Sequence, residues 1–552
     1  MNQLADTRHN TATGRRRWIG LGMLAASLSM IVLDGTIVGV ALPTLIADLD
    51  LDVSQAQWVN GIYSVVFAAL LLTSGRLGDR FGRRRLLIIG IVVFVAGSAI
   101  AAAASSAATL IGARTVQGVG GALILPTTLS SVNATFRGRD RAIAFGVWGA
   151  VISGMAALGP LVGGWITTVF TWQWIFLVNV PIGALLIIGV LATVTETRER
   201  DIVPGLDVIG LLLSVAGFGL VIFGLIEGQS LGWWTPSSAI TVFGLTWGTD
   251  AAISPIPVAL FLGAVALTCF VLWELHRGRA GRSAILDLRL FRTRSFRWGN
   301  LVALCVAIGE FGLLFALPLF IVNALGVGTL QAGLALAAMG VGAFVSGALA
   351  RQVTARFTAP TTVLIGLVLE TVAVFALVVT VAASIPLWLL AALLVVYGLG
   401  LGLASAQLTG TVLADIPVEQ SGQGSATQST VRQLGAALGT AVIGTVLAAS
   451  LAGLVPARLD AVPALPAAHA ATLSDATVSA AGGTIEPLRE QGTHSRLGDA
   501  TPAVVDALAA GMADATRVSL GAAGLFLALG AIASAGLRRR VSDGSRRASA
   551  ER

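Results

Sequence analysis

The feature that most constrains this chain is a succession of apolar blocks of about twenty residues, separated by short segments rich in arginine. A helix of about 20 apolar residues is long enough to cross the hydrocarbon core of a bilayer. Only 11% of the residues are charged, whereas soluble globular proteins average roughly 25%. A soluble chain of 552 residues would need several charged domain surfaces. The pattern therefore predicts an all-α polytopic membrane protein.

Fourteen transmembrane helices are predicted from these blocks. They occupy residues 18–43, 57–75, 86–105, 108–132, 142–168, 174–194, 206–226, 255–275, 298–323, 329–350, 361–383, 386–410, 429–452 and 513–537. The blocks divide into a six-helix N-terminal half (18–195), two inserted spans with their linkers (196–297) and a six-helix C-terminal half (298–537). Paired halves with a binding site between them near the membrane midplane are a known transporter architecture.

The distribution of arginine predicts the orientation in the membrane. The chain has 35 basic residues, all of them arginine, and a net charge of +7. Basic residues concentrate in cytoplasmic loops, which places the tails 1–17 and 538–552 in the cytoplasm. Arg114 falls within a span, and four arginines fall outside: Arg458, Arg489, Arg496 and Arg517. Arginines that lie in short clusters between spans are orientation signals, and they do not indicate a nucleic-acid partner.

Two segments are expected on the outer side of the membrane. Residues 237–248 are apolar but too short to cross, so they are expected in an outer loop, lying in the interface. Residues 453–511 form the longest polar segment, rich in Ala, Pro, Asp and Thr. They are expected to form a weakly structured extracellular loop.

The motifs of other protein classes do not occur. The sequence has no phosphate-binding Walker loop, so energy is expected from an ion gradient rather than from ATP. Its four histidines and its two cysteines, Cys269 and Cys305, have no metal-binding or disulfide spacing. We expect no enzymatic activity, no metal and no cofactor other than protons as the coupling ion.

Two charged residues inside spans are the main candidates for proton coupling. A carboxylate at the centre of a span costs about 2.5–3.5 kcal/mol on insertion scales, which makes Asp34 a candidate proton carrier. At about 1.5 Å rise per residue, Arg114 lies roughly 8–10 Å below the outer edge and Asp34 roughly 12–14 Å. We hypothesise that Arg114 interacts with Asp34 and tunes its protonation. The alternatives are an Asp34 satisfied by neighbouring helices and an Arg114 that extends to the outer surface.

The loop between the second and third spans reads GRLGDRFGRRR over residues 75–85. The glycines, Gly75 and Gly82 among them, allow a tight turn and close helix approach. Asp79 can cap a helix or pair with an arginine such as Arg80 or Arg83 across the loop. The segment is interpreted as a charged conformational latch. The alternative is a positively charged stop signal with turn glycines.

The fifth span carries a stripe of small residues that includes Gly159, Pro160, Gly163 and Gly164. Spacings of three and four place such residues on one helix face, where they allow close packing against another span. Proline bends the helix at that point.

Four more acids lie in or beside spans. Glu310, in the middle of the ninth span, is a candidate for a second proton or for a cationic substrate. Glu370, in the eleventh span, is either functional or part of a helix contact. Glu227 and Glu274 lie at span ends, where we expect solvation.

These segments resemble the motifs of the major facilitator superfamily. Residues 75–85 match its signature loop at Gly75, Leu77, Asp79, Arg80, Gly82, Arg83 and Arg84. Residues 33–43 are similar to the first-span motif of the fourteen-span drug:proton antiporters, with Gly39 where Asn is usual. Arg114, Gln117 and Gly118 match the fourth-span motif, which is implicated in proton coupling. Residues 159–164 resemble the antiporter motif that distinguishes exporters from importers, although Met155 replaces an upstream glycine.

The resemblance implies a major facilitator fold and a monomeric, proton-coupled antiporter in a bacterial cytoplasmic membrane. It implies export of amphipathic or cationic drugs, antibiotics or secondary metabolites by alternating access. An importer of a small solute and a non-transporting membrane receptor or scaffold remain as alternatives. A membrane enzyme is a third, but it would require a polar catalytic cluster.

Overall fold

The computed structural model describes residues 2–136, 138–198, 207–242, 245–280, 285–286, 288–416, 421–463 and 465–550. The N-terminal half consists of long helices joined by short turns. They are α1 (Asn2–Leu49), α2 (Val53–Phe81), α3 (Arg83–Ala102), α4 (Ala107–Thr135), α5 (Gly138–Val169), the single turn α6 (Trp174–Leu177) and α7 (Asn179–Thr193).

A pair of helices, α8 (Val208–Glu227) and α9 (Pro255–Arg279), follows this half and is joined at one end by a hairpin of β1 (Ile240–Val242) and β2 (Leu245–Trp247). The C-terminal half then contains η1 (Leu288–Arg292), α10 (Arg294–Leu319), the π-helical turn η2 (Phe320–Ala324), α11 (Thr329–Phe357), α12 (Ala359–Thr380), α13 (Leu387–Val412), α14 (Ser421–Leu459), α15 (Ala467–Ser479), α16 (Ile485–Gln491), η4 (Gly492–His494), η5 (Gly498–Ala500) and α17 (Thr501–Ala550).

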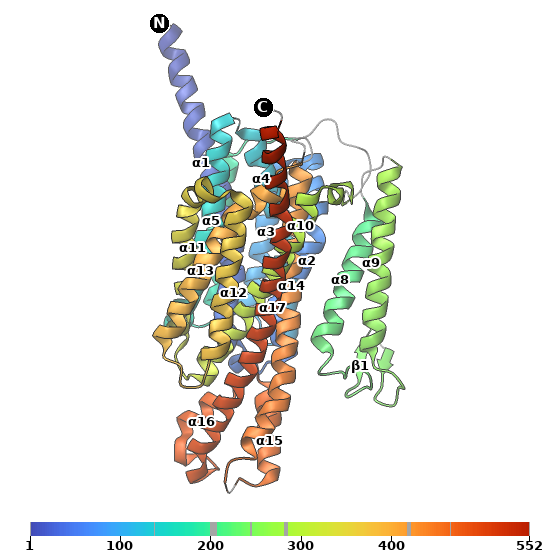
Figure 1. Cartoon of the computed structure of the whole chain (residues 1–552), viewed down its shortest axis with the longest axis vertical. Helices are drawn as coiled ribbons and strands as arrows, with labels where there is room; N and C mark the ends of the chain where they lie inside the picture. The colour runs from blue at the N-terminus through green and yellow to red at the C-terminus, as the bar shows by residue number, and fades with distance from the viewer. Residues whose placement is uncertain are drawn as a thin grey trace.

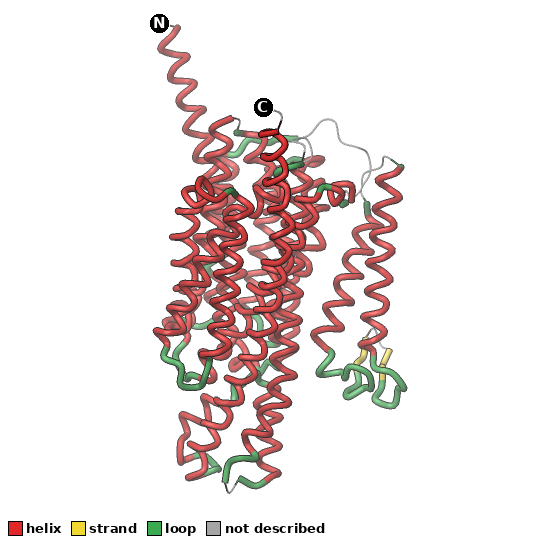
Figure 2. Tube along the Cα trace, in the orientation of Figure 1, coloured by secondary structure: helices red, strands yellow, loops and turns green. Residues whose placement is uncertain are grey.

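The long helices run side by side as one bundle, with α8 and α9 beside it (Figure 1). Both chain termini lie at one end, called here the terminal end, and α15 and α16 project from the opposite cap end (Figure 1). Figure 2 shows helix along nearly the whole chain, with strand only at the tip of the α8–α9 pair. The all-α architecture predicted from the sequence is confirmed, with the addition of this small hairpin.

Twelve helices in the described part of the chain are long and apolar enough to cross a membrane. They correspond to twelve of the fourteen predicted spans. The other two predictions, 57–75 and 142–168, fall on α2 and α5, which are 29 and 32 residues long. A helix needs about 20 residues to cross a bilayer, so a total of fourteen is compatible with the structure and stays a prediction.

Side chains that cap the backbone determine where several helices begin. Asp52 accepts a hydrogen bond from the N–H of Gln55, and the Gln55 side chain accepts one from the N–H of Asp52. This capping box satisfies two N–H groups that the first turn of α2 would leave unpaired. Ser106 caps α4 in the same way by accepting from Thr109.

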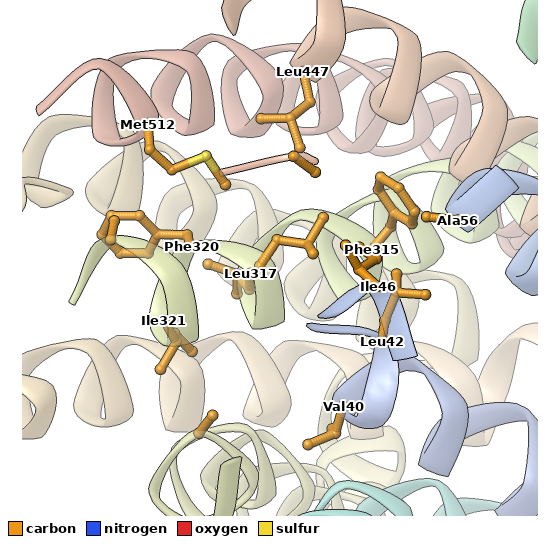
Figure 3. Packing of buried hydrophobic residues seen from close by; sticks show 14 of the residues in the cluster. Val40, Leu42, Ile46, Ala56, Phe315, Leu317, Phe320, Ile321, Leu447 and Met512 are labelled. Atoms are coloured by element: carbon orange, nitrogen blue, oxygen red, sulfur yellow. The ribbon is translucent and has the colours of Figure 1, made fainter. Parts of the chain in front are cut away.

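The largest apolar cluster joins the two halves. It contains residues of α1, such as Leu42 and Ile46, together with Phe315 and Phe320 from the end of α10 and from η2. Figure 3 shows Leu42 and Ile46 lying beside Phe315. Residues of α14 and α17 belong to the same cluster, among them Leu447. The halves are therefore packed together rather than tethered by a linker.

One of the two expectations about outer segments is wrong. The segment 453–511 is helical over most of its described length: α14 continues to Leu459, α15 and α16 follow, and α17 begins at Thr501. The apolar residues Ala470, Ala481 and Ile485 are buried there, and this burial stabilises helices whose composition alone suggests a loop. The second segment, 237–248, was expected not to cross the membrane; in the structure it contributes the short β1–β2 hairpin to the connection between α8 and α9.

Candidate functional site

The centre of the N-terminal half contains a buried ion pair. Nη1 of Arg114, on α4, donates to the Asp34 carboxylate, on α1, over 2.5 Å. The side chains are 0% and 1% exposed. The Arg114 Nε also donates to the backbone carbonyl of Val59, on α2, at 3.2 Å. One guanidinium thus connects three helices, as its planar set of donors allows.

Amide groups complete the coordination of the carboxylate. Gln117 and Asn179 each donate to Oδ1 of Asp34 over 2.9 Å. Both amides also donate to the hydroxyl of Ser98, at 2.8 and 3.2 Å. Because Gln117 lies one turn after Arg114, the two side chains share a face of α4, and Arg114 also donates to Gln117. Helices α1, α4 and α7 therefore meet at the Asp34 carboxylate, and α3 joins the same network through Ser98.

Tyr63 closes one side of this cluster. The Arg114 guanidinium lies 4.5 Å from the centre of the Tyr63 ring, within the range of a cation–π interaction. Gly118 permits the close approach of α4 to α2, because a Cβ at Gly118 would lie 2.9 Å from the Tyr63 carbonyl oxygen. Arg114 Nη2 and the Tyr63 hydroxyl have no hydrogen-bond partner in the described ranges.

The arrangement makes the charge of Asp34 matter to the bundle. An ionised Asp34 accepts from three donors, and removing one partner of a buried ion pair typically costs 3–5 kcal/mol. Protonation of Asp34 would weaken its attraction to Arg114 and thus the link between α1 and α4. The Asp34 carboxylate therefore links α1 electrostatically to α4 and by a hydrogen bond to α7.

The 75–85 segment ends α2 and begins α3. Gly82 has φ +113°, and a Cβ at that position would lie 2.7 Å from the Glu196 carboxylate. Glu196 accepts hydrogen bonds from the backbone N–H groups of Arg84 (3.1 Å) and Arg85 (3.3 Å). A carboxylate at a helix N-terminus is stabilised by the helix dipole. The acid that caps α3 is therefore Glu196, which was not singled out from the sequence.

Other predicted members of the latch lie near this turn. Gly75 packs against Pro126 of α4, and the N–H of Arg83 donates to the Thr197 carbonyl at 3.1 Å. The Arg80 guanidinium lies 5.5 Å from the Phe81 ring. The Asp79 side chain lies outside the described part of the structure.

The stripe 159–164 on α5 is a point of close contact with two helices. A Cβ at Gly163 would lie 3.1 Å from the Ile37 carbonyl of α1, and one at Gly164 would lie 2.6 Å from the Thr329 carbonyl of α11. From the other side, a Cβ at Gly333 would lie 2.5 Å from the carbonyl oxygen of Pro160. The seam between α5 and α11 lies near the cap end and joins the two halves.

A small cavity lies between the halves. Its walls come from α1 and α2 on one side and from α10 and α11 on the other, and they are mostly apolar, with Thr36 and Asn60 as polar members. The lining residues are Gly35, Thr36, Gly39, Val40, Asn60, Phe311, Leu314, Pro318 and Leu336. Gly35 and Phe311 directly follow Asp34 and Glu310 in sequence, but the two acids themselves are not among the lining residues.

The remaining acids differ from one another in environment. Glu310 is 7% exposed and lies 3.9 Å from Nη2 of Arg432, on α14. Glu370 is fully buried. The expectation of a solvated Glu274 is wrong, because it is 1% exposed and accepts from the N–H of Leu286. Glu227 is half-buried and accepts from the indole N–H of Trp58 at 2.7 Å.

Residues 22–440 match the family model of the Major Facilitator Superfamily. The chain belongs to the Major Facilitator Superfamily. The resemblance carried by the 75–85 and 114–118 motifs is thereby confirmed.

Relatives in this superfamily include exporters. The chain is 32% identical over 456 residues to a probable actinorhodin transporter of Streptomyces coelicolor, covering 81% of this chain and 75% of that protein. It is 31% identical over 509 residues to the multidrug efflux pump LfrA of Mycolicibacterium smegmatis, covering 88% and 95%. The alignment with LfrA thus covers nearly the whole length of that pump.

A solved structure shows the same superfamily fold. The bacterial homologue of the human lysosomal transporter Spinster superposes with a TM-score of 0.62 and covers 96% of this chain and 98% of its own. At 18% identity, this similarity concerns the fold alone. The predicted major facilitator fold is confirmed.

Within this superfamily member, sequence reasoning missed two residues that contact the central carboxylate network. They are Asn179 and Ser98, neither of which was predicted from the sequence as a site residue. The sequence signal was present for Asn179, since an amide inside an apolar helix requires a partner. For Ser98 there was none, because serine can bond its own helix backbone.

Proposed function

We propose that this multi-pass transporter is a proton-coupled antiporter that exports amphipathic drugs, antibiotics or secondary metabolites across the cytoplasmic membrane. The observation that carries the proposal is the buried Asp34–Arg114 pair. Charged side chains inside a membrane are costly, so they are rare there and usually mark a functional site. This pair connects α1, which lines the cavity, to α4, which does not.

The cycle follows from the position of α1. With Asp34 ionised, Arg114, Gln117 and Asn179 hold α1 against the N-terminal half. Proton binding at Asp34 neutralises the carboxylate and frees α1 to change its packing against α10 at the cavity. Substrate bound between Thr36 and Phe311 would then be exchanged against the proton as the halves move about the α5–α11 seam.

Export is the direction we infer, since LfrA is a multidrug efflux pump and the stripe at Gly159–Gly164 resembles the motif of exporters. The small cavity has a mostly apolar lining, which an amphipathic substrate would contact once the halves separate enough to admit it. A cationic group on that substrate would find Glu310 beside Phe311. We further propose that the protein acts as a monomer, with both termini in the cytoplasm as the arginine distribution indicates.

The test uses inside-out membrane vesicles, with a fluorescent cationic dye that the wild-type protein transports added to the solution outside them. We expect dye uptake into these vesicles to depend on an imposed proton gradient and to stop when a protonophore is added. Asp34→Asn, present at wild-type levels in the membrane, is expected to abolish gradient-driven uptake. Asp50→Asn is the matched control, because Asp50 lies at the exposed end of the same helix.

The outcomes separate the alternatives. Uptake that continues after the protonophore, or in Asp34→Asn at the wild-type rate, contradicts proton coupling through Asp34. Movement of dye only down its own gradient indicates a facilitator. A fusion of a fluorescent reporter to the C-terminus, which fluoresces only when it folds in the cytoplasm, checks the orientation.

A further inference from the structure

We propose that Glu370 on α12, with Glu310 on α10 and Tyr397 on α13, forms a second proton-binding site in the C-terminal half. The site would exchange its proton for a cationic group in the central cavity. The inference rests on the proposed proton-coupled transport and adds to it a separate site and a role for Glu370.

Glu370 is the least compensated acid in the described part of the protein. Its side chain is 0% exposed, and neither carboxyl oxygen has a hydrogen-bond partner among the residues described. The hydroxyl of Tyr397, also 0% exposed, is likewise without a partner there. A buried carboxylate without a partner is strongly unfavourable, whereas the neutral acid is much less so. The geometry therefore favours a protonated Glu370 in this conformation.

Close helix packing holds Glu370 in place. Gly400 on α13 lies against α12, so that a Cβ there would be 2.8 Å from Cγ of Glu370. Gly366 lies one turn before Glu370 on α12 and also approaches α13 closely. A Cβ added at Gly366 would lie 2.6 Å from the Gly400 carbonyl oxygen. Water has little room to replace the missing partners along this contact. A group held so tightly exchanges its proton only when α12 and α13 separate or when a neighbouring charge changes.

The charges around Glu370 support a shared proton. Glu310 and Arg432 lie within electrostatic range of it, and Arg432 is 3.9 Å from Glu310. One guanidinium balances one carboxylate, so two ionised acids would leave a net charge of −1, with Glu370 fully buried and Glu310 7% exposed. Carboxyl groups that interact strongly titrate as a pair rather than as separate residues, and the proposal takes Glu310 and Glu370 to be such a pair.

Other elements packed against α12 add no compensating charge at this depth. Helix α17 contains no Asp, Glu or Arg between residues 518 and 537. Its Arg517 donates to the Val381 carbonyl at the end of α12, several turns from Glu370. The arginines of α11, Arg351 and Arg356, are exposed near the opposite end of that helix. Tyr397 is therefore the polar group that α13 contributes here.

The position of the cluster corresponds to that of the Asp34 network. In each half an acid lies on the first helix, Asp34 on α1 and Glu310 on α10. In each half polar groups follow on the third and fourth helices: Ser98 and Gln117 in one, Glu370 and Tyr397 in the other. The N-terminal cluster has donors for its acid, whereas the C-terminal cluster has a second acid. In the proposed site, a proton bound to the carboxyl group neutralises the charge that donors stabilise in the N-terminal cluster.

The central cavity connects this cluster to transport. Phe311, which directly follows Glu310, lines the cavity, although Glu310 itself does not. In the proposed exchange, loss of the proton to water leaves two carboxylates against the single guanidinium of Arg432, and a monovalent cation that enters between the halves restores the charge balance. Binding of a cationic substrate and release of the proton thus become alternatives, which is the requirement for antiport.

Infrared spectroscopy tests the site without transport. The purified full-length protein in lipid nanodiscs is titrated with base while the carbonyl stretching band of protonated carboxyl groups is recorded. Glu370→Gln is expected to remove one band attributable to a carboxylic acid in apolar surroundings, and Glu370→Asp to restore one. Asp415→Asn, at an exposed acid, is the matched control that leaves this band unchanged. A Glu370→Gln spectrum with every wild-type carboxyl band at every pH would overturn the proposal.

A flux measurement then separates this proposal from the function on which it rests. In proteoliposomes, the number of protons moved per molecule of cationic dye is expected to fall by about one in Glu370→Gln, while dye transport persists through Asp34. Equal proton-to-dye ratios in the variant and the wild type would overturn the second site. Loss of the infrared band together with undiminished proton-driven transport in Asp34→Asn would contradict the proposed role of Asp34 and support that of Glu370.

Discussion

Gly159 on α5 lies so close to Thr36 on α1 that a Cβ at Gly159 would come within 1.8 Å of the threonine hydroxyl oxygen. Thr36 also lines the cavity between the halves. The stripe of small residues therefore presses α5 onto the helix that carries Asp34. The movement of α1 that we propose would therefore change the contact between Thr36 and Gly159.

The seam between the halves gives the first prediction. Gly333→Ala is expected to reduce transport severely, because its new methyl group would lie 2.5 Å from the Pro160 carbonyl oxygen and prevent closure of α5 on α11. Gly347→Ala on the same helix is the control, since nothing lies within 4 Å of a Cβ there. Dye efflux, normalised to the amount of protein in the membrane, measures both. Efflux at the Gly347→Ala rate in Gly333→Ala would contradict the prediction, because it would show that transport does not require close contact between α5 and α11.

Movement at this seam is testable by cross-linking. The hydroxyl oxygens of Thr168 on α5 and Thr329 on α11 are 3.0 Å apart. In a background without Cys269 and Cys305, the double variant Thr168→Cys, Thr329→Cys is expected to form a disulfide that stops transport until a reductant is added. Each single variant serves as the control. Transport at the wild-type rate through the cross-linked protein would exclude opening of this seam during the cycle.

Arg114→Lys keeps the positive charge but loses the planar set of donors. The guanidinium of Arg114 bonds Asp34, Gln117 and the Val59 carbonyl at once, and a lysine ammonium cannot reproduce that geometry. We expect the rate of proton-driven efflux to fall about 10-fold or more, which corresponds to about 1.4 kcal/mol. Arg351→Lys, at an exposed arginine of α11, is expected to have no effect. Retained efflux in Arg114→Lys would mean that charge alone suffices.

Asn179→Ala tests the residue that the structure adds to the network. It removes one donor to Asp34 and one to Ser98, and a lost hydrogen bond to a charged group costs about 1.5–3 kcal/mol. We expect both slower efflux and a changed dependence of efflux on external pH. Ser98→Ala removes no direct contact with Asp34 and is expected to leave the pH profile in place. The same pH profile in Asn179→Ala and in the wild type would restrict Asn179 to a structural role.

The turn between α2 and α3 is expected to be intolerant of a side chain. Gly82→Ala places a Cβ in a left-handed conformation and within 2.7 Å of Glu196. The conformational cost alone is about 1–2 kcal/mol. Gly492→Ala separates the two causes, because Gly492 also has positive φ but has nothing within 4 Å. Thermal unfolding in detergent is expected to show a larger loss of stability for Gly82→Ala than for Gly492→Ala. Equal losses would show that the Glu196 side chain moves away from the new methyl group without a measurable cost.

Much of the site could be predicted because charged residues are rare within membrane-spanning segments. Asp34 and Arg114 stand out in apolar spans, and counting the rise along two helices places them at similar depths. The same reasoning missed Glu196 and Ser98, which lie in a linker and among small residues. Their roles depend on contacts with segments that are distant in sequence. The residue pattern of one helix does not predict such contacts.

The sequence by itself determined the class of the protein, twelve of its long apolar helices and its family, because the bilayer allows only segments of sufficient length and apolarity to cross. Tertiary structure decided which polar groups meet. It placed Asn179 on Asp34, gave α3 its cap from Glu196, folded 453–511 into helices and left Glu370 without a partner. The physical reason is that burial and hydrogen bonding are properties of pairs of segments, and their geometry exists only once the helices are packed together.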